Sequence, residues 1–247
     1  MFAKIKHKVF NSKLALKYFS KYTNKISYSQ YGEDKILGFA LKILKSKNLI
    51  DYISYLDLGG CLAIECSNTY FLYRQGYSGV VIEAVPELAA EFKKIRKNDI
   101  VLNIGVTAEN SGNEMPFYFA EGVCGSFDKS TVLDAIDKCG LKSKCKKMDI
   151  PTRNINDIMS EYFSEKPLFL FSIDVEGIDE DILKSLDFRN FKPYFFCVET
   201  AELSGEKFLG KKKPEIISFM AANGYEVYAD TYINTIFIRK DILEKMF

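Results

Sequence analysis

The chain has 247 residues, 47% of them hydrophobic and 27% charged, and a formal net charge of +1. This length and composition are typical of a folded globular protein and exclude a disordered one. The near-neutral net charge argues against a nucleic-acid-binding protein, which is usually basic. No apolar run approaches the length that spans a bilayer.

The cysteines and the single histidine narrow the chemistry. Six cysteines are scattered without a Cys-x-x-Cys pair, and no signal peptide is recognisable, so we expect reduced thiols in a cytoplasmic protein. Zinc is disfavoured because the only histidine, His7, is far in sequence from Cys139 and Cys145. His7 also lies in a lysine-rich segment, which argues against a histidine-dependent hydrolase and leaves a carboxylate, lysine, tyrosine or cysteine as the general base.

Residues 1–27 contain seven lysines and no acidic residue, with Phe10, Leu14 and Phe19 interleaved among the lysines. A basic amphipathic helix of this kind is typical of two situations. Either it packs on the edge of the domain with its lysines in water, or it contacts an anionic membrane or an acidic partner. We treat residues 1–27 as a basic helical extension of a domain that comprises residues 28–247.

Predicted strands and helices alternate through the rest of the chain. The strands are expected at 52–58, 80–84, 100–106, 114–120, 144–150, 168–171, 194–199, 225–229 and 233–238. The helices are expected at 33–44, 67–75, 86–97, 154–163, 179–186 and 214–223. This order predicts one doubly wound α/β domain with a mostly parallel sheet and helices on both faces. The strand at 114–120 is expected to be an extra antiparallel strand, and 122–126 a small-residue loop that covers a site.

The strongest candidate site follows the apolar run 168–171, where the chain reads Ser172-Ile173-Asp174-Val175-Glu176-Gly177. Ligands of open α/β sheets bind beyond the carboxyl ends of the strands, and two acids seldom end a buried strand without a partner. Asp174 and Glu176 would share a face in an extended segment, and Glu199 ends the neighbouring strand. These three acids are candidates for a general base, for a divalent cation site, or for an N-cap and a solvated turn.

A second candidate site follows the first two strands. Asp57-Leu58-Gly59-Gly60 closes one strand and Glu83 closes the next, where a carboxylate can accept both hydroxyls of a ribose. The full Gly-x-Gly-x-x-Gly pattern that cradles a pyrophosphate is missing. The pattern therefore favours a cofactor without phosphates, such as S-adenosylmethionine, over a dinucleotide. An ordinary strand-to-helix turn is the other interpretation.

Several short motifs occur in the order found in a known family. They are Ser29-Gln30-Tyr31-Gly32-Glu33-Asp34, Asp57-Leu58-Gly59, Ser67-Asn68-Thr69-Tyr70, Gly79-Val80-Val81-Ile82-Glu83, Asn103-Ile104-Gly105-Val106 and Ile173-Asp174-Val175-Glu176-Gly177. Between Tyr28 and Ile238 the chain resembles the FkbM-type S-adenosylmethionine-dependent O-methyltransferases. The resemblance implies a Rossmann-like fold of the class I methyltransferases. It also implies methylation of a hydroxyl on a sugar or small metabolite, in bacterial surface-glycan or natural-product biosynthesis.

The resemblance also implies roles for individual residues. Asp57 and Gly59 would line the methionine end of the cofactor, and Ser67 and Asn68 would lie near its carboxylate at a helix N-terminus. Glu83 would bind the ribose and Asn103 would lie beside the adenine, while Asp174 and Glu176 would stand near the transferred methyl group.

The chain departs from the family at the loop after the first strand. It has Gly60-Cys61 where the family usually has Ala-Asn or a similar pair. The departure leaves two other functions open. One is a non-catalytic scaffold that docks through its basic N-terminus on a glycan-assembly enzyme or a membrane, and the other is an NAD(P)-dependent oxidoreductase.

Overall fold

The computed structural model describes residues 26–109, 113–121, 123–138, 140–175, 177–201 and 212–247. Nearly all of the basic extension predicted at 1–27 therefore lies outside the described residues. Within them, none of the helices combines the length and the apolar composition that crossing a membrane requires.

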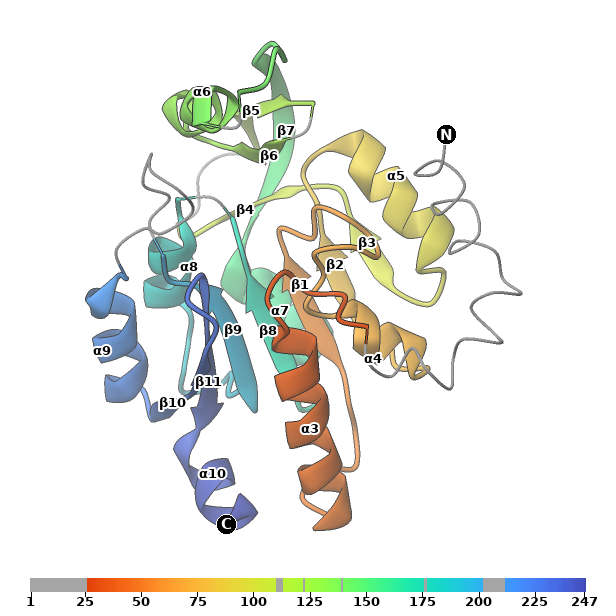
Figure 1. The fold of residues 1–247 in the computed structure, drawn as a ribbon, viewed down its shortest axis with the longest axis vertical. Coiled ribbons are helices and arrows are strands. Elements are labelled where there is room, and N and C mark those ends of the chain that lie inside the picture. The colour runs from red at the N-terminus through yellow and green to blue at the C-terminus, as the bar shows by residue number, and fades with distance from the viewer. Residues whose placement is uncertain (1–25, 110–112, 122, 139, 176, 202–211) are drawn as a thin grey trace.

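Among the described residues, a sheet of seven strands forms the centre of the fold (Figure 1). Its strands are β1 (Tyr55–Leu58), β2 (Val80–Ile82), β3 (Ile100–Leu102), β8 (Leu170–Ile173), β9 (Phe195–Glu199), β10 (Tyr225–Asp230) and β11 (Asn234–Arg239). They lie in the order β10-β11-β9-β8-β1-β2-β3, and β11 is antiparallel to both of its neighbours. The other pairs are parallel, as the alternating order of elements predicted.

Helices cover both faces of this sheet because its strands alternate their apolar side chains between the two faces. One face packs against α7 (Ile155–Phe163), α8 (Asp179–Ser185) and α9 (Pro214–Ala222). The other packs against α3 (Glu33–Ser46), α4 (Tyr70–Arg74), α5 (Pro86–Ile95) and α10 (Lys240–Met246). In β1, for example, Leu56 and Leu58 belong to the first core and Tyr55 to the second. The prediction of a doubly wound α/β domain is confirmed.

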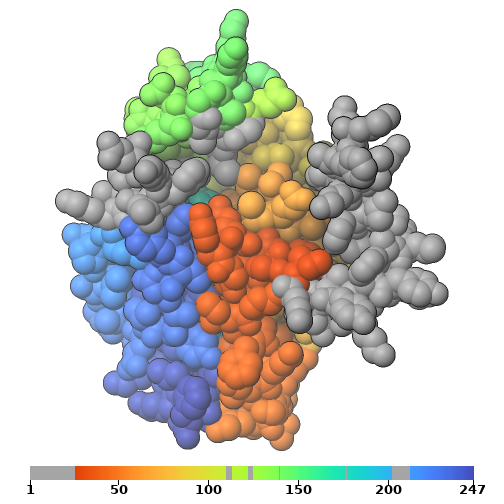
Figure 2. All heavy atoms as spheres, viewed as in Figure 1, coloured from red at the N-terminus to blue at the C-terminus, as the bar shows by residue number. Residues whose placement is uncertain are grey.

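A second, smaller sheet is inserted between β3 and α7. It contains β4 (Gly105–Thr107), β7 (Lys146–Asn154), β5 (Glu114–Ala120) and β6 (Val123–Ser126) in this order, with α6 (Lys129–Lys138) alongside. In Figure 2 the green residues of this insertion form one end of the molecule, beyond the red start of α3. We call it the inserted sheet.

The inserted sheet corrects two predictions. The single strand expected at 100–106 is divided, because β3 stays in the main sheet while β4 pairs with β7. The loop expected at 122–126 is wrong, because β6 pairs with β5 there. The antiparallel strand at 114–120 is confirmed, although it belongs to the inserted sheet.

Local signals set several helix ends. Pro86 occupies the first turn of α5, and the side chain of Asn154 accepts a hydrogen bond from the Asn156 N–H at the start of α7. The predicted start of α4 at Ser67 is three residues early, since the helix begins at Tyr70. The Ser67 hydroxyl nevertheless accepts the backbone N–H of Tyr70, so it still serves the helix start.

Candidate active site

The carboxyl ends of the main-sheet strands bring predicted site residues into one row. Strand pairing places Leu102, Ile82, Leu58, Ile173 and Val198 side by side in this order. The residues that follow them continue the same order, which is Asn103, Glu83, Gly59, Asp174 and Glu199. Five residues that the sequence predicted separately are thus neighbours at one edge of the sheet.

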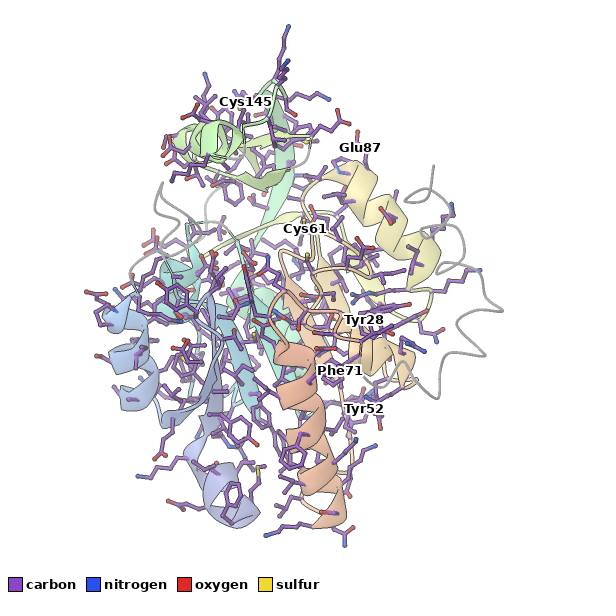
Figure 3. All side chains as sticks on the ribbon, in the orientation of Figure 1. Tyr28, Tyr52, Cys61, Phe71, Glu87 and Cys145 are labelled. Carbon is purple, nitrogen blue, oxygen red and sulfur yellow. The ribbon has the colours of Figure 1, made fainter. Side chains whose placement is uncertain are left out.

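A pocket lies between this row and the inserted sheet, with about 540 Å³ of empty space when the part open to solvent is included. Glu83 and Asp174 are its charged lining residues within the described part of the chain. Most other lining positions are apolar side chains or glycines from both sheets. Cys61 also lines the pocket, and Figure 3 shows it in the region between the main and the inserted sheet. Such a mixture of an apolar wall and a few polar groups is typical of small-molecule sites.

Gly59 is required at its position because the backbone after β1 lies very close to the backbone after β8. Its φ is +80°, and a Cβ atom built on it would lie 1.8 Å from the carbonyl oxygen of Asp174. The two segments are also joined by a hydrogen bond of 3.0 Å from the Asp174 N–H to the Leu58 carbonyl. Any larger residue would push the two loops apart.

Glu83 is the neighbour of Gly59 in the row of strand ends and is 6% exposed. Its two carboxylate oxygens accept the backbone N–H groups of Cys61 and Val85, each at 2.8 Å. Burial raises the pKa of Glu83 to about 7, although these two hydrogen bonds oppose the shift. Each oxygen has a second lone pair, so the side chain can still accept a ligand hydroxyl.

Asp57 is buried beneath the pocket and does not line it. It accepts a hydrogen bond from the Thr69 hydroxyl and lies 3.7 Å from the Arg96 guanidinium. Burial raises the pKa of Asp57, and the positive charge of Arg96 and the Thr69 hydroxyl oppose this shift. The structure thus places this predicted residue in a support for the loop after β1.

Arg96 is the centre of this support, and sequence analysis missed it. Its fully buried guanidinium donates to the Ala63 carbonyl at 2.7 Å, the Thr69 hydroxyl at 2.8 Å and the Ser67 hydroxyl at 2.6 Å. The ring of Phe92 lies beneath its plane, with the guanidinium carbon 4.8 Å from the ring centroid. An arginine that follows an amphipathic helix is normally solvated, so no sequence signal marked it.

The other predicted cofactor residues also shape loops. Ser67 is used by Arg96 and by the start of α4. The Asn68 amide donates to the Ser172 hydroxyl at 3.1 Å and so connects this loop to β8. The Asn103 amide donates to the carbonyls of Glu83 and Ala84, both at 2.8 Å, and fixes the turn after β2.

The predicted catalytic acids differ in position. Asp174 is half-buried and lines the pocket, whereas Glu199 is buried, 8% exposed, and lies next in the row. Glu176 lies outside the described residues. Among the residues that the structure describes, no group of three acidic, cysteine or histidine side chains is arranged to hold a metal ion.

Two buried acids at the start of α3 have different partners: Asp34 holds the segment before the helix, and Glu33 joins the helix to the same edge of the sheet. Asp34 accepts the Ser29 hydroxyl at 3.1 Å, and Glu33 accepts the Thr231 hydroxyl at 2.6 Å and the Asn234 amide at 2.9 Å. Burial opposes ionisation of Glu33, but its hydrogen bonds outweigh this effect and lower its pKa. Since Asn234 pairs with Glu199, this motif borders the row of strand ends.

Comparisons with known proteins agree with this arrangement at the level of family. The model of the methyltransferase FkbM domain matches residues 57–227, which contain the row and the pocket. No curated protein sequence matches the chain significantly.

Solved structures give more distant likenesses. A TehB-like SAM-dependent methyltransferase from Corynebacterium glutamicum is 11% identical, with a TM-score of 0.40 over 92% of this chain and 96% of that one. A magnesium protoporphyrin IX methyltransferase from Synechocystis, with bound SAM, is 10% identical, with a TM-score of 0.38 over 96% of each chain.

Proposed function

The chain belongs to the family defined by the methyltransferase FkbM domain, and on that premise we propose that it transfers the methyl group of S-adenosylmethionine to a hydroxyl of a sugar or related small metabolite. The proposed setting is bacterial surface-glycan or natural-product biosynthesis, which rests on the resemblance of the motifs. The observation that carries the proposal is the row of strand ends, which puts Glu83 and Asp174 at one apolar pocket.

The pocket residues fit an adenosine that carries no phosphate. The apolar side chains suit a purine, and the Glu83 carboxylate suits the two ribose hydroxyls. Within the described part of the chain no lysine, arginine or histidine lines the pocket, so a pyrophosphate would have no counter-charge there. This feature supports S-adenosylmethionine over NAD(P) as the cofactor.

In this proposal the other cofactor residues act through the shape of the loops. Asp57, Ser67 and Arg96 hold the loop after β1, and Asn103 holds the turn that carries Glu83. Gly59 lets this loop approach Asp174 closely. Asn68, two residues before α4, is the residue of this set that we place nearest to the cofactor carboxylate.

The cofactor supplies an electrophilic methyl group, and the protein must position the acceptor and remove its proton. Asp174 lines the pocket at the strand end, and we assign it the role of accepting or orienting the hydroxyl proton. Glu199, the next residue in the row, and Glu176, from the same motif, are its proposed partners. None of these roles requires a histidine.

Calorimetric titration with S-adenosylhomocysteine tests the cofactor assignment. We expect saturable binding by the purified full chain, and weaker binding by Glu83→Ala. The absence of heat at millimolar ligand would overturn the enzyme proposal and favour the scaffold. Tight NAD(H) binding without S-adenosylhomocysteine binding would favour the oxidoreductase.

Methyl transfer to nucleotide-activated sugars and small glycan precursors tests the reaction. We expect Asp174→Asn to lower kcat by about 10²- to 10⁴-fold, the range for loss of a general base, while the S-adenosylhomocysteine affinity changes little. Unchanged turnover in Asp174→Asn, Glu176→Gln and Glu199→Gln would remove these acids from the reaction.

A further inference from the structure

The inserted sheet contributes two aromatic rings to the pocket. Phe117 comes from β5 and Phe127 follows β6, and both line the pocket opposite the main sheet. Their centroids are 5.4 Å apart and their planes are at 84°, which is an edge-to-face pair. Phe117 is buried at 6% exposure and Phe127 is only half-buried, so Phe127 is the more accessible of the two.

Each of the two rings packs directly against the backbone of a glycine. A Cβ atom on Gly105 would lie 2.5 Å from Cζ of Phe127, and one on Gly125 would lie 2.2 Å from Cε1 of Phe117. Neither glycine has a positive φ, so turn geometry does not explain them. Their role is to leave the space that the two rings occupy.

The rings lie on the Glu83 side of the pocket. They belong to a small core in which Phe117 packs with Val85 and Ile150, and Leu88 of α5 packs against the same core. Val85 is two residues after Glu83, and its N–H donates to that carboxylate. In Figure 3 the labelled Glu87, at the start of α5, lies just below the inserted sheet. The inserted sheet is therefore anchored where the ribose would bind.

We propose that the purine of the cofactor stacks on the ring of Phe127, which is held in place by its contact with Phe117. The inserted sheet thereby determines the purine specificity of the site. The inference rests on the proposed cofactor. If the ribose hydroxyls bind Glu83, the purine can contact Ala84, Ile104 and Phe127, which line the same pocket. These three side chains are uncharged and apolar, which suits a flat uncharged base.

The test is a calorimetric titration of the full chain with S-adenosylhomocysteine, adenosine and homocysteine. We expect Phe127→Ala to weaken S-adenosylhomocysteine and adenosine by the same factor, about ten- to a hundredfold, the range for loss of one base-stacking ring. The matched control is Tyr118→Ala, which removes a half-buried β5 ring that neither lines the pocket nor packs on the small core around Phe117. This control should leave both affinities within about twofold of wild type.

Two further variants keep the test decisive if Phe127→Ala does not fold. Phe127→Leu keeps most of the apolar volume and loses the ring face, and Gly105→Ala displaces the ring because its Cβ atom would lie 2.5 Å from Cζ of Phe127. Both should weaken adenosine more than homocysteine. Wild-type affinity for adenosine in folded Phe127 variants would overturn this inference alone, whereas no binding of S-adenosylhomocysteine by wild type would overturn the proposed function with it.

Discussion

The loop after β1 and the segment after β8 contact each other at the pocket, but different hydrogen bonds hold each of them in place. The first, residues 59–69, is tied to a distant part of the chain by the buried guanidinium of Arg96. The second is held locally, because the Asp179 carboxylate accepts the N–H groups of Val175 at 2.9 Å and Gly177 at 3.3 Å. A rigid, non-local support suits a cofactor loop, and a local one suits a segment that presents a reacting acid.

The largest expected effect comes from removing the non-local support. Arg96→Met leaves Asp57 buried without its positive partner, and we expect the free energy of unfolding to fall by about 3–5 kcal/mol. Urea unfolding measures this change. The control is Arg153→Met, which breaks a largely exposed ion pair with Glu161 and should lower the free energy of unfolding far less than Arg96→Met does. Equal costs for the two variants would show that Arg96 does not hold the loop.

The same contrast explains what the sequence predicted. The order of elements and the acids after β8 are local signals, since periodicity and strand ends are visible within a few residues. The support of the loop after β1 depends on Arg96, which is 39 positions from Asp57 (96 − 57) and becomes buried only when α5 packs on the sheet. Asp57 was therefore predicted as a ligand contact, although it lies in the support.

The inserted sheet was the other part that could not be predicted from the sequence. Strand β5 was predicted correctly from its alternation, but its partner strand β6 reads Val123-Cys124-Gly125-Ser126, with few strand-forming residues. Its pairing depends on Gly125 accommodating the Phe117 ring, which is a tertiary contact. The positions of Phe117 and Phe127 in the pocket follow from the same pairing, so they could not be predicted either.

The contact between the two segments can be broken by a substitution at Gly59. Gly59→Ala combines a positive φ with a Cβ atom 1.8 Å from the Asp174 carbonyl, and we expect a loss of about 3 kcal/mol or more in unfolding free energy. Gly76→Ala is the matched control, since Gly76 has a φ of +91° and a Cβ atom added there would meet nothing within 4 Å. It should cost only about 1 kcal/mol. Similar costs would mean that the two segments separate easily.

Loss of the local support should affect turnover more than cofactor binding. Asp179→Ala leaves two backbone N–H groups without their acceptor, and we expect it to cost about 2 kcal/mol in unfolding free energy. We expect kcat to fall while the S-adenosylhomocysteine affinity stays within about threefold, because the loop after β1 keeps its own support. Asp187→Ala is the control, since Asp187 also accepts two backbone N–H groups but in an exposed turn. A larger change in affinity than in kcat would contradict the division between the two segments.

The smallest effect concerns Glu83, which holds the pocket end of the loop after β1 through the Cys61 N–H. Burial raises its pKa to about 7, so the neutral acid predominates below this pH in the free protein. Ribose hydroxyls donate to the carboxylate, and binding therefore favours the ionised form. The affinity for S-adenosylhomocysteine should rise about tenfold between pH 6 and pH 8, following the ionised fraction, and level off above.

Glu83→Gln separates this titration from that of other buried acids. Asp57 is the charged neighbour that adds to the upward shift of the Glu83 pKa, and it is unchanged in the variant. A glutamine cannot ionise, so the variant should bind more weakly than wild type at pH 8 and lose the rise between pH 6 and pH 8. A rise that persists in Glu83→Gln would assign the titration to Asp57 or to the acids after β8. The ribose would then be recognised without the Glu83 carboxylate.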